Sequence, residues 1–177
     1  MTTPTLDAPA RRWTPGRVVV ALVIVALVAM WGYVLFLAFG PGRQPPPDQL
    51  SDPAFGRNAQ AVCEAAHDQV ATLPPAVQAQ SAAERAEIIA LANAQFSAMV
   101  DDLEPLAPAG EDGDIVAAWI ADWRTYLADR EAYADALRTD PEARLYVTAR
   151  DREQITEYLD AFAADNHMPA CATPIDV

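Results

Sequence analysis

The chain has 177 residues and a formal net charge of −13, from 25 acidic and 12 basic residues. That length is enough for one compact domain beside a short further segment. The negative charge argues against nucleic acid as a partner, because binding would press like charges together and the sequence has no basic stripe.

The run from Val18 to Phe39 contains no charged residue and is apolar or aromatic except at Gly32. A helix rises about 1.5 Å per residue, so this run reaches roughly 33 Å, enough to cross a hydrocarbon core of about 30 Å. We therefore predict a transmembrane helix over residues 18–39. The alternative is a cleaved signal peptide, whose apolar core is usually about 7 to 15 residues long, whereas this core is longer and runs through Leu35, Phe36 and Phe39 into Gly40.

The flanks of this run predict its orientation. Arg11, Arg12 and Arg17 precede it, whereas only Arg43 follows closely. By the positive-inside rule, residues 1–17 form a cytoplasmic tail, and the chain is a single-pass protein of the cell membrane with its C-terminal part outside the cytoplasm. Nine of the 12 arginines and 24 of the 25 acidic residues lie beyond Phe39, which gives that part a net charge of −15.

Residues 40–53 are rich in proline and read as an extended linker that holds a domain, residues 54–177, away from the bilayer. Apolar residues three and four apart then predict four amphipathic helices. The helices are expected to begin at Asp52, Ser81, Asp114 and Asp151, and to end before Pro74, at Pro105, near Thr139 and at Asn166. The best start signal is the capping box formed by Ser81 and Glu84.

The stretch Leu145–Thr148 has the composition of a strand, but it is isolated, so we expect an extended connector. The predicted fold class is therefore all-α. It consists of one N-terminal transmembrane helix and a bundle-like extracytoplasmic domain of four helices.

Cys63 and Cys171 are the two cysteines of the chain. In an oxidising compartment outside the cytoplasm, such a pair most simply forms a disulfide. The alternative is a zinc site, because His67 and His167 each stand four residues from a cysteine, a spacing that places two ligands on one face of a helix. The expected compartment favours the disulfide, and we expect neither a metal nor another cofactor.

Two groups of residues are candidates for a ligand or partner surface. Trp119, Trp123 and Tyr126 lie along one side of the third predicted helix, where they could form an aromatic groove for a sugar or a peptide. Core packing is the favoured interpretation of such a stripe. Arg150 and Arg152, with Arg144 nearby, cluster before the fourth helix, whose N-terminus could help to bind an anion.

Two segments carry a resemblance to known proteins: Ala117-Ala-Trp-Ile-Ala-Asp-Trp-Arg-Thr-Tyr-Leu-Ala-Asp-Arg-Glu131 and Asn166-His-Met-Pro-Ala-Cys-Ala-Thr-Pro174. In these two segments the chain resembles a group of uncharacterised actinobacterial single-pass membrane proteins. The resemblance implies a helical domain on the extracytoplasmic side and a cysteine near the C-terminus, but no activity.

No serine-hydrolase elbow, Walker loop, dinucleotide glycine pattern, HExxH or CxxCH motif occurs in the sequence. The sequence thus favours an interaction module over an enzyme. The leading hypothesis is a membrane-anchored extracytoplasmic module, an accessory subunit or scaffold with a protein partner at the cell envelope. The alternative is a small-ligand-binding protein or an envelope enzyme that uses an aromatic cleft on the third helix.

Overall fold

The computed structural model describes residues 15–40 and 46–176. The chain divides after Pro45 into two units, of which the first contains helix α1 (Pro15–Phe39) and the second contains all the other elements. The predicted cytoplasmic residues 1–14, with Arg11 and Arg12, and the linker residues 41–45, with Arg43, lie outside the described residues.

Helix α1 confirms the predicted apolar helix. It has 25 residues, and its most apolar 18-residue window has a mean hydropathy of 2.8. By length and composition it is able to span a membrane. Among the described residues, which start at Pro15, the helix already includes the three residues before the predicted Val18.

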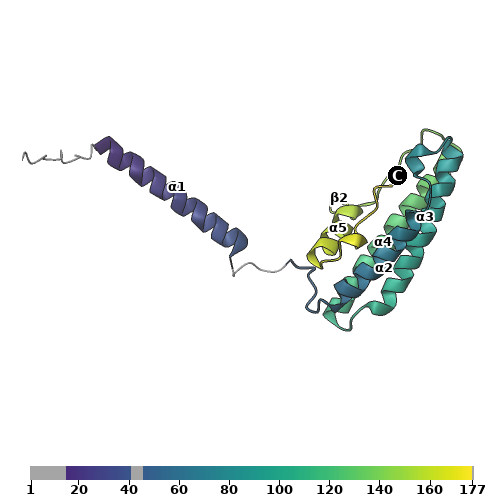
Figure 1. Cartoon of the computed structure of the whole chain (residues 1–177), viewed down its shortest axis with the longest axis horizontal. Coiled ribbons are helices and arrows are strands. Elements are labelled where there is room, and N and C mark those ends of the chain that lie inside the picture. The colour runs from purple at the N-terminus through teal and green to yellow at the C-terminus, as the bar shows by residue number, and fades with distance from the viewer. Residues whose placement is uncertain (1–14, 41–45, 177) are drawn as a thin grey trace, which may run out of the picture. The chain divides into compact units, whose positions relative to one another are not determined.

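The second unit is mostly helical, as the sequence predicts. Helix α3 (Ala82–Leu103) packs against both α2 (Ala54–Val70) and α4 (Glu111–Leu137), and α5 (Ile155–Asp165) packs against α4 (Figure 1). Three single turns of 3₁₀ helix complete the helical elements: η1 (Ala76–Gln78), η2 (Glu104–Leu106) and η3 (Pro169–Cys171).

The core of this unit forms where the apolar stripes of the four α-helices meet. Phe96 of α3, Trp119 and Trp123 of α4, and Leu159 and Phe162 of α5 belong to one large buried cluster. A smaller cluster, which includes Ile89 and Leu137, packs α3 against the C-terminal half of α4. Burial of these side chains is the main favourable contribution to folding of the unit.

The predicted start of α3 is confirmed, whereas α2 begins two residues after the predicted Asp52, at Ala54 with Pro53 in the N-cap position. Ser81 Oγ accepts a hydrogen bond from the Glu84 amide at 3.1 Å, and the Glu84 carboxylate accepts one from the Gln80 amide at 2.6 Å. The carboxylate thus reaches one residue further back than in a standard capping box. At the start of α2, Asp52 Oδ1 accepts a hydrogen bond from the Ala54 amide at 2.8 Å.

The predicted starts of the other two helices are wrong. Helix α4 begins at Glu111 rather than at Asp114, after Gly110 at a positive φ of 78°, and its first turn carries acidic side chains that suit the positive end of the helix dipole. Asp151 does not open α5. Asp151 and Arg152, with φ of 50° and 77°, form the two-residue turn between β1 (Ala149–Arg150) and β2 (Glu153–Gln154), which pair as an antiparallel hairpin.

The second unit begins earlier than the predicted domain boundary at residue 54. Leu50 is only 8% exposed, and its amide donates a hydrogen bond to Asn166 Oδ1 at 2.8 Å. Asn166 Nδ2 donates to the Asp48 carbonyl at 3.0 Å, and the Ser51 amide donates to Asp112 Oδ2 at 2.9 Å. Residues 48–51, expected to be part of an extended spacer, are therefore docked on the end of α5 and the start of α4.

Candidate functional site

The predicted pairing of the two cysteines is confirmed. Cys63 in α2 and Cys171 in η3 lie at disulfide bonding distance, with 5.2 Å between their Cα atoms, and both are buried. The alternative zinc site is wrong because its two sulfur ligands are joined to each other. His67 instead packs edge-on against the Phe96 ring, with 5.2 Å between ring centroids.

The three aromatic candidates lie in the core rather than in an open groove. Trp119, Trp123 and Tyr126 are all at least 97% buried. Trp123 makes edge contacts with both neighbours, at centroid distances of 6.4 Å to Trp119 and 5.8 Å to Tyr126. The three side chains therefore pack in the core, which is the favoured interpretation of this stripe.

A cleft of about 330 Å³ lies where α4, α5 and the β1 strand meet, and Trp119 is one of the residues that line it. Trp119, Ile115 and Phe162 provide its apolar surface. Ala118 and Tyr158 also line the cleft, and its charged residues are Asp48, Glu111, Asp114, Asp122 and Arg150. With four carboxylates and one guanidinium, the cleft favours a cation over an anion.

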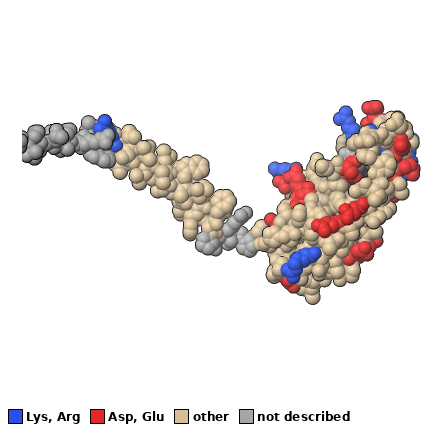
Figure 2. Space-filling model, viewed as in Figure 1, with Lys and Arg blue, Asp and Glu red and all other residues tan. Residues whose placement is uncertain are grey.

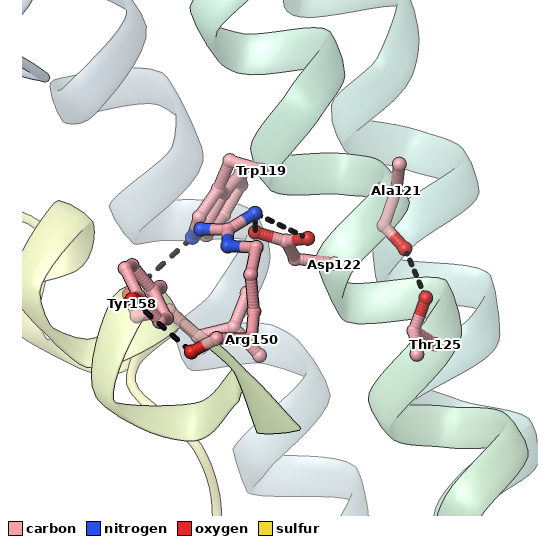
Figure 3. Close-up of polar contacts among 7 residues, drawn as sticks. Trp119, Ala121, Asp122, Thr125, Arg150 and Tyr158 are labelled. Carbon is pink, nitrogen blue, oxygen red and sulfur yellow. Dashed lines mark hydrogen bonds and ion pairs between the residues drawn. The ribbon is translucent and has the colours of Figure 1, made fainter. Parts of the chain in front are cut away.

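Contacts with Asp122 and Tyr158 hold the Arg150 side chain at the edge of this cleft (Figure 3). Its Nη1 donates to both carboxylate oxygens of Asp122, at 3.0 and 2.8 Å, and its guanidinium carbon lies 4.0 Å from the centroid of the Tyr158 ring. The Tyr158 hydroxyl donates to the Arg150 carbonyl at 3.3 Å. The guanidinium therefore lies against an aromatic ring and beside a carboxylate, an arrangement that holds cations in proteins.

The structure does not bring Arg144, Arg150 and Arg152 together as the predicted anion site requires. The charge of Arg150 is engaged by Asp122, and Arg152 is exposed in the hairpin turn and is not among the residues that line the cleft. Arg144 lines a different hollow, beside Tyr133 and Tyr146. Of the six residues in the two candidate groups, Trp119 and Arg150 line the cleft where α4, α5 and β1 meet, whereas Trp123, Tyr126, Arg144 and Arg152 do not.

Several residues of the cleft had no clear signal in the sequence. Asp122 follows Trp119 by three positions, so the helical period places it on the same side of α4, but its pairing with Arg150 spans 28 residues. Tyr158 lies inside the fourth predicted helix, where no motif singles it out. Asp48 belongs to the proline-rich stretch, for which no contact was predicted.

A second polar cluster surrounds Arg130, which is 0% exposed in the middle of α4. Its Nη1 and Nη2 donate to the two carboxylate oxygens of Asp176, at 2.7 and 2.8 Å. Its Nε donates to Asn93 Oδ1 at 2.7 Å, and its guanidinium carbon lies 5.7 and 5.6 Å from the ring centroids of Phe96 and Tyr126. The buried cation is thus matched by one carboxylate and enclosed by aromatic rings.

The protonation states within this cluster follow from burial and pairing. Burial acts to lower the pKa of Arg130, but the hydrogen bonds and charge of Asp176, with those of Tyr126, raise that pKa above its ordinary value. Burial raises the pKa of Tyr126, although the neighbouring Arg130 acts in the opposite direction. Arg130 is therefore a permanent cation and Tyr126 a neutral phenol at physiological pH.

In residues 15–40 and 46–176, no group of three or more histidine, cysteine, aspartate or glutamate side chains is placed to hold a metal ion. Comparisons of the chain with protein families, with curated proteins and with solved structures found no match.

Proposed function

We propose that this protein is a membrane-anchored interaction module of the cell envelope. Helix α1 crosses the membrane once with its N-terminus in the cytoplasm, and the second unit, a bundle-like domain of four helices, is an accessory subunit or scaffold outside the cytoplasm. The observation that carries the proposal is α1 itself, because it has 25 residues and its most apolar window has a mean hydropathy of 2.8. A helix of this length and composition suits a membrane span.

The disulfide supports the proposed side of the membrane. Disulfides persist in oxidising compartments outside the cytoplasm and are rare within it. The Cys63–Cys171 bond joins α2 to η3 across 108 residues and is buried, so it is part of the folded unit. A domain built in this way suits an extracytoplasmic location.

The surface of the second unit supports a protein partner. Acidic side chains are spread over the face seen in Figure 2. The unit also exposes large apolar side chains at Val77, Leu91, Tyr146 and Ile175. Negative charge makes nucleic acid and anionic lipid headgroups poor partners. A protein surface with basic residues fits better.

Charged substitutions in α1 test the anchor. Val25→Arg combined with Val28→Arg places two charges near the middle of the helix, where each costs about 2.5 to 3.5 kcal/mol on insertion scales. The variant is expected to leave the membrane fraction, whereas the wild-type chain resists alkaline carbonate extraction. Val77→Arg in η1 is the matched control and should stay with the membrane. Release of the wild-type chain by carbonate would contradict the proposal.

The cleft beside Arg150 supports a second candidate function, the binding of a small organic cation. Its observation is the Arg150 guanidinium, which already lies on the Tyr158 ring next to Asp122. Benzyltrimethylammonium is expected to shift the Trp119 indole N–H resonance in a saturable way, and Tyr158→Leu is expected to weaken this binding about fivefold. Tyr146→Leu is the control, because Tyr146 is exposed outside the cleft. An unshifted Trp119 resonance would eliminate this candidate.

A further inference from the structure

Residues 169–176, called the strap, follow α5 without forming a long helix and are held at several points along their length. The disulfide joins Cys171 to α2, and the Ala170 amide donates to Gln60 Oε1 at 3.0 Å. The Thr173 amide donates to Asp160 Oδ1 at 2.7 Å. Further along, Asp176 makes the two-pronged ion pair with the buried Arg130.

Between these attachment points the strap presents an apolar side chain to solvent. Ile175 is 100% exposed, although the residue that follows it is fixed by the ion pair with Arg130. Exposed isoleucines on flexible segments are ordinary, but this one is held in place on both sides. It is therefore available for contact at little further cost in chain entropy.

Ile175 borders a groove of about 500 Å³ between the strap and the C-terminal half of α2. Its lining is mostly apolar and includes Val70, Ala71, Ala170, Ala172, Pro174 and Ile175. Two exposed carboxylates, Glu64 and Asp68, lie one turn apart on α2 and also border the groove. None of the described residues that line the groove is an arginine.

The apolar lining and the acidic edge of this groove indicate which kind of partner it can bind. An apolar floor accepts an apolar side chain, and acidic residues at the edge attract basic residues beside it. A second copy of this chain is a poor occupant, because its outer part carries the same negative charge. A peptide segment with an apolar residue between arginines or lysines is complementary on both counts.

We propose that the groove between α2 and the strap is the docking site for such a basic, apolar segment of an envelope protein. The inference rests on the proposed function and gives it a surface and a partner chemistry. The apolar side chain of the partner packs against Ile175 and Ala172, and its basic residues lie beside Glu64 and Asp68. The disulfide and the Arg130–Asp176 pair hold the strap in position and so form one wall of the site.

The test uses the full oxidised chain in detergent micelles and a fluorescent 12-residue peptide with leucines between arginines. Fluorescence anisotropy is expected to show binding. A peptide with serine for leucine and one with glutamate for arginine should each bind at least about tenfold more weakly. Ile175→Asp, and Glu64→Arg combined with Asp68→Arg, should weaken binding of the first peptide to the same extent.

Matched variants separate groove binding from general attraction to an acidic protein. Val77→Asp removes another exposed apolar side chain, and Glu153→Arg with Glu157→Arg makes the same change in net charge away from the groove. Both are expected to leave the affinity within about twofold of wild type. The proposal is overturned if the peptide does not bind, or if these controls weaken binding as much as the groove variants do.

Photo-crosslinking in native membranes distinguishes failure of this site from failure of the proposed function. A photoreactive residue at position 175 is expected to yield one adduct, which the basic peptide suppresses and the Glu64→Arg, Asp68→Arg variant loses. An adduct from position 77, 91 or 146 but not from 175 would overturn the groove and leave an interaction module in place. An adduct with a second copy of the chain would overturn the assigned partner, and absence of adducts at all four positions would overturn both proposals.

Discussion

Asp176→Asn is expected to lower the free energy of unfolding of the helical unit by about 3 kcal/mol. Arg130 is fully buried, and Asp176 supplies its full negative counter-charge at 2.7 and 2.8 Å while remaining 25% exposed itself. The amide leaves a buried cation without its charged partner, which is among the most destabilising single changes known, about 3 to 5 kcal/mol for a fully buried pair. We take the lower end because Asp176 is partly solvated.

A double-mutant cycle with urea denaturation checks this prediction. Arg130→Met with Asp176→Asn removes the charge as well as its partner, so the double variant should be more stable than Asp176→Asn alone. Ile175→Ser is the control for changes in the strap, since that side chain is fully exposed. Equal stability of wild type and Asp176→Asn would show that the ion pair does not hold the strap.

Loss of the disulfide is expected to have a still larger effect. The bond closes a loop of 108 residues. In the chain-entropy model, a loop of this size corresponds to about 4 to 5 kcal/mol, of the same order as the total stability of many domains. Cys63→Ala with Cys171→Ala should therefore unfold at much lower urea concentration than the oxidised wild type.

Alanine is used at both positions because a serine would bury an additional hydroxyl group. The wild type in the presence of reductant should unfold at the same urea concentration as the double alanine variant, and reductant should not affect that variant. A loss of less than about 1 kcal/mol on reduction would mean that packing alone holds η3 against α2.

The helices could be predicted from the sequence because their signals are local. Apolar residues three and four apart identify α2 to α5, and Ser81 with Glu84 marks the start of α3. The start of α4 was misplaced because a glycine at positive φ, rather than a capping side chain, precedes it. The Asp151–Arg152 turn was missed because its positive φ values are usually signalled by glycine or asparagine.

The candidate sites depend on contacts that local patterns do not encode. The Cys63–Cys171 pair could be predicted because the chain has only two cysteines. The helical period puts Arg130 on the same side of its helix as Trp123 and Tyr126, but its partner Asp176 lies 46 residues away in a segment without periodicity. The docking of residues 48–51 through Asn166 likewise follows from tertiary packing, which joins positions 116 and 118 residues apart.

The side of the membrane on which the helical unit lies is the most direct test of this account. Spheroplasts that produce the chain with a tag at each end would be treated with an external protease. The proposal predicts loss of the C-terminal tag from intact spheroplasts and survival of a membrane-bound fragment that contains α1 and the N-terminal tag. A C-terminal tag that stays protected until the cells are lysed would contradict the proposed topology, and with it an extracytoplasmic partner.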